Sequence, residues 1–277
     1  MRNRISAFAA TLSLMILIGC APSATPTAEP SAVPPAQPSV EIQPTETAPA
    51  PQSQPEAENI FTFNEMGISV GFDHPAGIEQ SINTAYIEAY EPQAPFELPY
   101  PAHARVLFTA YADGMDTPLA DGLRIFRVDE INTLEAGVIE SLNAVLEEQT
   151  DHHNDFPRLA GAGSVIDAQL IPLPFKNGTG YRYLLTKSFS ADPLTSTTIT
   201  YLYQGITNDE KYFVSFIMNV DAPFLAEYIG QPLTTSEEFE TYYQNVNTLV
   251  DTAGGDQFSP SLIALDELVA SVIVLEK

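Results

Sequence analysis

The chain has 277 residues, of which 36 are Asp or Glu and 11 are Lys or Arg, so its formal net charge at pH 7 is −25. So acidic a surface repels phosphate backbones and anionic headgroups, which argues against nucleic-acid binding. The length suffices for one domain with a sizeable core, and a single cysteine, Cys20, excludes an internal disulfide.

The N-terminus has the pattern of an export signal. Arg2 and Arg4 precede an apolar run from Ile5 to Ile18, and the sequence Leu17-Ile18-Gly19-Cys20 closes it. The run has 14 residues, whereas a helix needs roughly 20 apolar residues to span a bilayer. A charged start, a short apolar middle and a small residue before the cut are typical of a signal peptide.

The closing sequence resembles the lipobox of bacterial lipoproteins. The resemblance implies a diacylglyceryl group on the thiol of Cys20, cleavage before Cys20 and acylation of the new N-terminus, for example with palmitate. We therefore expect a signal peptide at residues 1–19, lipidation at Cys20 and an extracytoplasmic protein held at a bacterial membrane. The alternative is a secretory signal with a chance cysteine. Ala21 provides no retention signal of the aspartate kind, so inner and outer membrane both stay open.

Residues 20–58 follow as a linker. Ala21 to Glu58 contains ten prolines and almost no large apolar side chains. Such a segment cannot bury enough surface to offset its ordering entropy, so we expect it to be disordered. It would serve as a stalk between the membrane and a folded domain at residues 59–277.

The first part of this domain is predicted to contain three strands. Ile68, Val70 and Phe72 alternate with smaller residues, and the turn sequence Asp73-His74-Pro75 ends this strand. The segments 105–110 and 123–128 have the same character, and a long irregular stretch, residues 76–104, separates the first strand from the second. A helix follows: Asn132 is placed to cap it, with Glu135 at capping-box spacing, and apolar residues recur at helical intervals up to Leu146.

The next segments predict an antiparallel meander. Residues 170–175 and 181–188 flank Asn177-Gly178-Thr179-Gly180, whose glycines we expect to supply positive φ angles in a tight hairpin. Residues 198–206 and 211–220 form the next pair. The last of these strands is apolar on both sides, with Phe216 on one and Phe213 on the other, so both faces of the sheet should be covered.

The C-terminal part supplies that cover. Thr235-Ser236-Glu237-Glu238 opens a helix that Gly254-Gly255 ends, and Ser259-Pro260 is predicted to start a shorter helix with proline in its first position. Residues 271–275 are β-branched and could add an edge strand.

Residues 67–75 (GISVGFDHP) resemble the Gly-x-Ser-x-x-Tyr/Phe-Pro opening of PsbP-like domains. The later order is also similar: a helix, a meander with residues 177–183 (NGTGYRY), a strand beginning with residues 211–215 (KYFVS), and a helix. The whole chain resembles an uncharacterised family of bacterial lipoproteins with a Pro-rich stalk and such a domain. The resemblance implies an α+β fold, an antiparallel sheet flanked by helices in an αβα sandwich, and it carries no catalytic residue across.

Two polar clusters are candidate metal sites. Asp151-His152-His153-Asn154-Asp155 has ligand types suited to zinc or copper, but adjacent histidines diverge, so we expect a solvated helix exit. Asp113, Asp116 and Asp121 lie in a Gly-containing loop, but they lack the spacing of a calcium-binding EF-hand. We predict no metal and no cofactor at either cluster.

Nucleophilic catalysis has little support in the sequence. Gly161-Ala162-Gly163-Ser164 has the wrong spacing for a nucleophile elbow. His74 suits a strand-ending turn, and His103 is expected to be exposed in the irregular stretch. We therefore assign no catalytic residue, and the sequence favours a protein that is not an enzyme.

Two further features have local explanations. Tyr86, Tyr90, Phe96 and Tyr100 could form a ligand-facing wall of the 76–104 loop, although a loop pinned to the core explains them as well. Asn177-Gly178-Thr179 matches a glycosylation acceptor, but the hairpin explains it.

These observations favour a membrane-anchored lipoprotein that acts as a non-catalytic binding or interaction module. The alternative is a small-solute or metal-binding lipoprotein that uses the Tyr-rich loop or His152 and His153. An envelope hydrolase comes third. The partner, the ligand and the oligomeric state are not visible in the sequence.

Overall fold

The computed structural model describes residues 57–79, 81–92, 98–108, 110, 120–148, 150, 152–157, 161–190 and 192–277. All of them fall within the unit Gln54–Lys277. The predicted signal peptide (1–19), the lipidation site Cys20 and all of the predicted linker (20–58) except its last two residues lie outside the described residues.

Ten strands in this part of the chain form two antiparallel sheets. The larger has the order β3-β4-β5-β9-β8-β7-β6 and the smaller the order β1-β2-β10. The strands are β1 (Asn59–Phe63), β2 (Ile68–Phe72), β3 (Ile82–Ile87), β4 (His103–Phe108), β5 (Gly122–Arg127), β6 (Gly163–Pro172), β7 (Gly178–Ser188), β8 (Thr198–Thr207), β9 (Tyr212–Asp221) and β10 (Ile273–Glu276). The helices are α1 (Val128–Leu134), α2 (Val138–Leu146), α3 (Ser236–Thr252) and α4 (Leu262–Ser271), with short 3-10 turns η1 (Pro223–Tyr228) and η2 (Gly255–Gln257). The prediction of an α+β fold with antiparallel pairing is confirmed.

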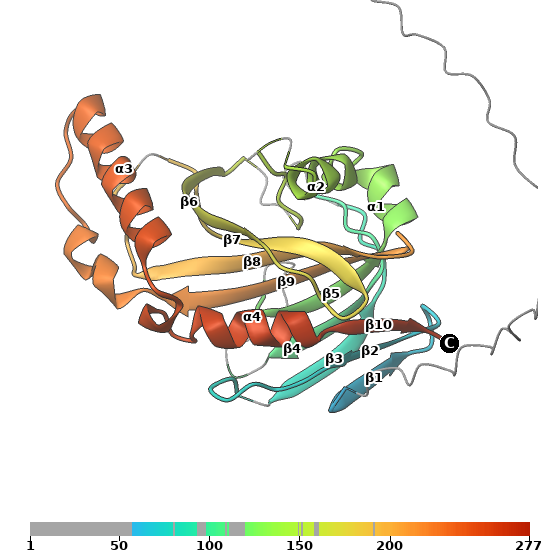
Figure 1. Cartoon of the computed structure of the whole chain (residues 1–277). Helices are drawn as coiled ribbons and strands as arrows, with labels where there is room; N and C mark the ends of the chain where they lie inside the picture. Colours follow the sequence, from blue (N-terminus) through green and yellow to red (C-terminus); the bar gives the residue numbers. More distant parts are fainter. Residues whose placement is uncertain are drawn as a thin grey trace, which may run out of the picture. The chain divides into compact units, whose positions relative to one another are not determined.

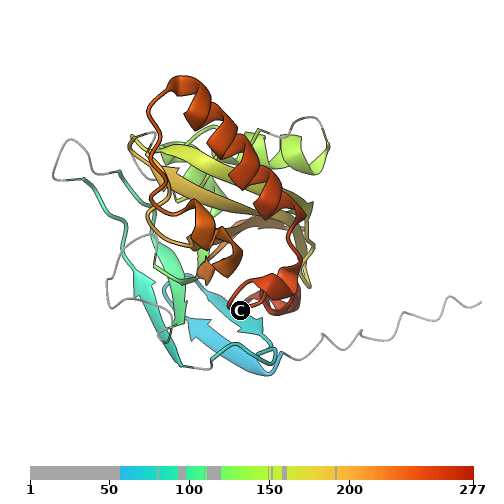
Figure 2. The same cartoon turned by 90° about the vertical axis from the view of Figure 1, so that its left-hand side faces the viewer.

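Apolar side chains cover the large sheet on both faces. On β9, Phe216 belongs to a cluster with α3, α4 and the small sheet, whereas Phe213 belongs to a second cluster with α1 and α2. Figure 1 shows α1 and α2 on one side of this sheet and α4 on the other. Figure 2, turned by 90°, shows α3 beside the sheet as well. The alternation along β9 therefore predicted the two-sided cover correctly.

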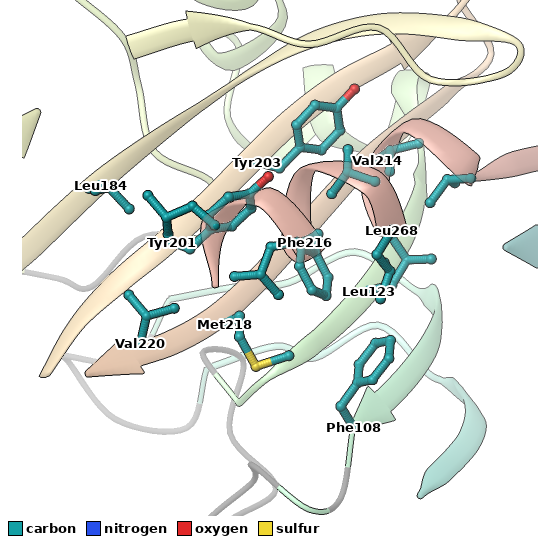
Figure 3. Close-up of a cluster of buried hydrophobic side chains, with 14 of the residues drawn as sticks. Phe108, Leu123, Leu184, Tyr201, Tyr203, Val214, Phe216, Met218, Val220 and Leu268 are labelled. Carbon is teal, nitrogen blue, oxygen red and sulfur yellow. The ribbon is translucent and has the colours of Figure 1, made fainter. Parts of the chain in front are cut away.

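The larger cluster lies between β5, β8, β9 and α4. Tyr201 and Phe216 meet edge to face with ring centroids 5.9 Å apart, and Leu268 of α4 lies over the same strands (Figure 3). The Tyr201 hydroxyl group donates a hydrogen bond of 2.8 Å to Oδ1 of Asp266, whose carboxylate also lies 3.3 Å from Nε of Arg182. This polar group ties α4 to the sheet.

The first predicted helix is two helices, because the chain bends at residues 135–137. Asn132 lies inside α1 and does not cap a helix, and Glu135 is the residue at which α1 ends. The helical spacing of apolar residues continues across the bend, since Ile131 and Val138 are both buried against the sheet. The break between α1 and α2 could therefore not be predicted from the spacing of apolar residues.

The β6–β7 hairpin turns where it was predicted, but β6 begins at Gly163 and not near residue 170, and the glycines of the turn have another role. Neither Gly178 nor Gly180 has a positive φ angle. A Cβ atom at Gly178 would lie 2.4 Å from the backbone oxygen of Ile206, and one at Gly180 would lie 2.3 Å from that of Gln204. These positions require glycine because β8 approaches so closely.

The C-terminal elements match the prediction apart from one cap. Thr235 caps α3 in a capping box with Glu238, and β10 forms an edge of the small sheet. Pro260 is not the first residue of α4, because Ser261 caps that helix and accepts a hydrogen bond of 3.2 Å from the Ile263 N–H group.

Side chains of α3 cover the outer edge of β6. The backbone N–H groups of Asp167 and Gln169 donate to Oδ1 of Asn247 (2.8 Å) and Oδ1 of Asp251 (2.9 Å), and Asn247 Nδ2 donates to the oxygen of Val165 (3.1 Å). These bonds satisfy backbone groups that an edge strand otherwise exposes. They also fix the position of Asp167.

Candidate functional site

The segment 152–157 carries the main polar cluster and follows α2. Phe156 anchors the segment, since it is buried against Phe126 with ring centroids 5.1 Å apart. The Asn154 side chain donates to the Gly137 oxygen (3.1 Å), and Ser215 Oγ of β9 donates to the Phe156 oxygen (3.0 Å). The segment is therefore held by both the helices and the sheet.

His153 lies between two carboxylates. Its Nδ1 atom is 3.2 Å from Oδ1 of Asp155, and its Nε2 atom is 3.1 Å from Oδ1 of Asp167 on β6. The His153 side chain is only 4% exposed, and its ring lies against that of Tyr183 with centroids 3.8 Å apart. Both ring nitrogens can donate only in the imidazolium form, so the geometry favours a charged His153.

The pKa of His153 reflects this arrangement. Burial lowers the pKa of the imidazole, but the hydrogen bonds and attraction from Asp155 and Asp167 outweigh burial and raise it to about 9. The prediction of a solvated helix exit is therefore wrong for His153, whereas His152 is exposed. Asp151 lies outside the described residues.

Asp155 connects His153 to the sheet. Its Oδ1 atom accepts a hydrogen bond of 2.7 Å from the Tyr183 hydroxyl group, and its Oδ2 atom is paired with Nζ of Lys187. Burial raises the pKa of Asp155, but the hydrogen bonds from His153, Lys187 and Tyr183 outweigh burial and lower it to about 2. Asp155 is therefore ionised at every physiological pH.

Two hollows adjoin the pair of Asp155 and Lys187. The larger, of about 460 Å³, also borders the start of α2 and His153. The smaller, of about 200 Å³, lies over the sheet and has a largely apolar wall. Its lining residues are Asp155, Pro157, Leu185, Lys187, Thr200, Leu202, Ile217 and Asn219.

The cluster can present hydrogen-bond donors to a ligand. It has no free lone pair on His153 to offer. Both nitrogens of that ring face carboxylates, so His153 is arranged neither as a metal ligand nor as a general base. Among the described residues, the Lys187 ammonium group contacts only Asp155 and Ser164, which leaves one of its three N–H donors. The described residues contain no group of three or more His, Cys, Asp or Glu side chains that could hold a metal ion.

Other sequence candidates lie apart from this cluster. Asp121 is buried, and its Oδ1 atom accepts a hydrogen bond of 2.8 Å from the Asn219 N–H group, so it links the start of β5 to β9. Its proposed partners Asp113 and Asp116 lie outside the described residues. Ser164 is no nucleophile elbow, since it lies on β6 and accepts a hydrogen bond of 2.9 Å from Lys187.

Of the remaining histidines, His103 is buried and His74 is half-buried. His103 is a buried residue of β4, with its ring 4.7 Å from that of Phe126, so the expectation of an exposed loop residue is wrong. His74 follows the end of β2, as predicted, and its ring contacts those of Phe72 and Phe108. Burial lowers the pKa of His74.

The 76–104 stretch is less irregular than predicted, because it contains β3. Tyr86 packs against the larger apolar cluster and Tyr100 against the smaller, so the two do not form one wall. Tyr90 and Tyr100 are joined by two backbone hydrogen bonds. Phe96 lies outside the described residues.

Asn177 is used by the fold. Its side chain donates to the Val274 oxygen (2.6 Å) and accepts from the Val274 N–H group (3.1 Å), so it completes the edge of β10. The Asn177 side chain thus has a structural role in holding β10 beside the β6–β7 turn.

Sequence reasoning missed Lys187, Tyr183 and Asp167. Tyr181, Tyr183, Leu185 and Lys187 alternate along β7, so they share one face of the sheet. A lysine at the same alternate spacing as three buried side chains is expected to face the core, and a lysine that faces the core requires a charged or polar partner. This spacing could have identified Lys187 as a candidate site residue.

Comparisons with known proteins leave the family open, since no protein-family model, curated protein or solved structure matches this chain. Within the described part of the chain, no helix has both the length and the apolar character needed to cross a membrane.

Proposed function

We propose that the chain is an exported bacterial lipoprotein, anchored to a membrane through Cys20, with residues 20–58 as a stalk. The domain at residues 59–277 is proposed to be a PsbP-like αβα sandwich that acts as a non-catalytic binding module. The lipobox resemblance supports the anchor. The antiparallel sheet with helices on both faces is compatible with a PsbP-like architecture.

One observation carries the binding role: the charged groups beside the hollows are held in mutual pairs. His153 is engaged by two carboxylates and Asp155 by three donors. General acid–base catalysis requires a group whose pKa lies near the working pH, whereas the pKa of His153 is raised to about 9 and that of Asp155 is lowered to about 2. Such a preorganised set of charges suits recognition.

The anchor is tested with the full chain expressed in a bacterium. Mass spectrometry of the membrane fraction is expected to give an N-terminal peptide that begins at lipidated Cys20. Cys20→Ser should abolish the lipid and release the protein from the membrane. An unmodified thiol, or an N-terminus upstream of position 20, would overturn the anchoring proposal. Robust turnover in a screen of envelope substrates would overturn the non-catalytic role.

A small-solute-binding lipoprotein is the second candidate, favoured by the hollows beside Lys187. Its metal-binding form is tested by thermal melting with zinc. A stabilisation of several degrees that His152→Ala abolishes would favour a metal site, and an unchanged melting temperature would count against it.

A further inference from the structure

The smaller hollow has two chemically distinct parts. Leu185, Leu202 and Ile217, from β7, β8 and β9, form an apolar floor. These three side chains are buried within the smaller apolar cluster, so the floor is a built part of the core and not a chance surface depression.

Two donors lie at the border of this floor. The Lys187 ammonium group has three N–H donors, and two of them are used by Asp155 and Ser164. Within the described residues, the third has no acceptor. The Thr200 hydroxyl group donates a hydrogen bond of 3.2 Å to Oδ1 of Asn219, which leaves Nδ2 of Asn219 as a donor. Both Lys187 and Asn219 line the hollow.

The local charge differs from that of the whole chain. His153 and Lys187 contribute two positive charges and Asp155 and Asp167 two negative charges, so the cluster is neutral within a chain of net charge −25. An anion therefore meets less repulsion here than over the acidic surface, and a charge-assisted hydrogen bond to an ammonium group is strong.

We propose that this hollow binds a small organic acid, with its carboxylate on Lys187 and Asn219 and its apolar part on Leu185, Leu202 and Ile217. The proposal names the class of solute for the small-solute-binding function given above as the second candidate, and it rests on that function. The hollow of about 200 Å³ limits the ligand to a compact acid with one small ring or a short branched chain. The two donors then meet the ligand's carboxylate and the three floor residues its apolar part, while the Asp155 carboxylate at the same border stays paired with Lys187.

The test is calorimetric titration of the full chain in non-ionic detergent with benzoate, and with its uncharged analogue benzamide and its cationic analogue benzylamine. Benzoate is expected to bind at least tenfold more tightly than either analogue. This comparison needs no substitution, so it remains decisive if a variant fails to fold. Equal or tighter binding of benzamide or benzylamine, or no binding of benzoate, would overturn the proposal.

Lys187→Met removes the ammonium group and keeps most of the stem. It should weaken benzoate binding at least tenfold, with folding checked by thermal melting. Lys176→Met is the matched control, because the Lys176 side chain is also 19% exposed and also pairs with an aspartate, Asp73, yet does not line the hollow. An equal loss in the two variants would contradict the assignment. Failure with benzoate leaves the anchoring and turnover experiments unaffected, so the two proposals fail separately.

Discussion

The stability of the protein should depend on pH through His153. Its folded-state pKa of about 9 lies above the ordinary value of 6.5. A group with a raised folded-state pKa stabilises the fold fully below its unfolded pKa, and this contribution is lost as the pH rises through the folded-state pKa. The window is therefore about pH 6.5 to 9, with stability falling as the pH rises.

The expected loss is about 2 kcal/mol. A pKa raised from 6.5 to about 9 corresponds to about 3 kcal/mol, at about 1.4 kcal/mol for each pH unit. The His153 side chain is almost fully buried, but the Asp167 carboxylate is 50% exposed and solvent screens its attraction. Because of this screening, the expected loss of unfolding free energy is about 2 kcal/mol and not about 3 kcal/mol.

The assay is urea unfolding of the native chain and of His153→Gln at intervals between pH 6 and 10. The free energy of unfolding of the native chain should fall by about 2 kcal/mol relative to that of His153→Gln across this range. Glutamine does not titrate, so the variant lacks this loss. His74→Gln is the control: the pKa of His74 is lowered, so its effect lies below pH 6.5. Parallel curves for the native chain and His153→Gln from pH 6.5 to 9 would refute the paired-imidazolium arrangement.

Three further changes test the fold by urea unfolding. Tyr201→Phe should lower the free energy of unfolding by about 2 kcal/mol, because it removes a hydrogen bond to the Asp266 carboxylate; no change would show that the bond contributes nothing. Thr235→Ala should remove about 1 kcal/mol by deleting the α3 cap, and an unchanged midpoint would speak against the capping box. Gly180→Ala should lower stability by about 3 kcal/mol or more, since its Cβ would lie 2.3 Å from the Gln204 oxygen; near-native stability would mean that β8 can move away.

The sequence was most informative where a pattern is local. The alternation of Phe213 and Phe216 along β9 was sufficient to predict cover on both faces, because side chains on a strand point to opposite sides in turn. The division between α1 and α2 was not predictable in this way. Ile131 and Val138 both face the sheet, so the helical spacing is uninterrupted although the backbone bends.

The candidate site depends on contacts between distant segments. His153 and Asp155 were recognised as a polar cluster, but their partners Asp167 and Lys187 lie on β6 and β7. The sequence alone does not show that β6 and β7 carry these side chains to the segment after α2. Without Asp167, the second ring nitrogen of His153 would be free, and a metal ligand would remain a reasonable interpretation.

The bonds between α3 and β6 have a consequence for self-association. Amyloid-like growth begins when an incoming strand finds vacant peptide groups on a sheet border. Asn247 and Asp251 of α3 already bond the backbone groups at this edge of β6. A strand from a second molecule can therefore pair with β6 only after α3 has dissociated from it. At this edge of the large sheet, chance contacts between molecules are therefore kept from growing into a shared sheet.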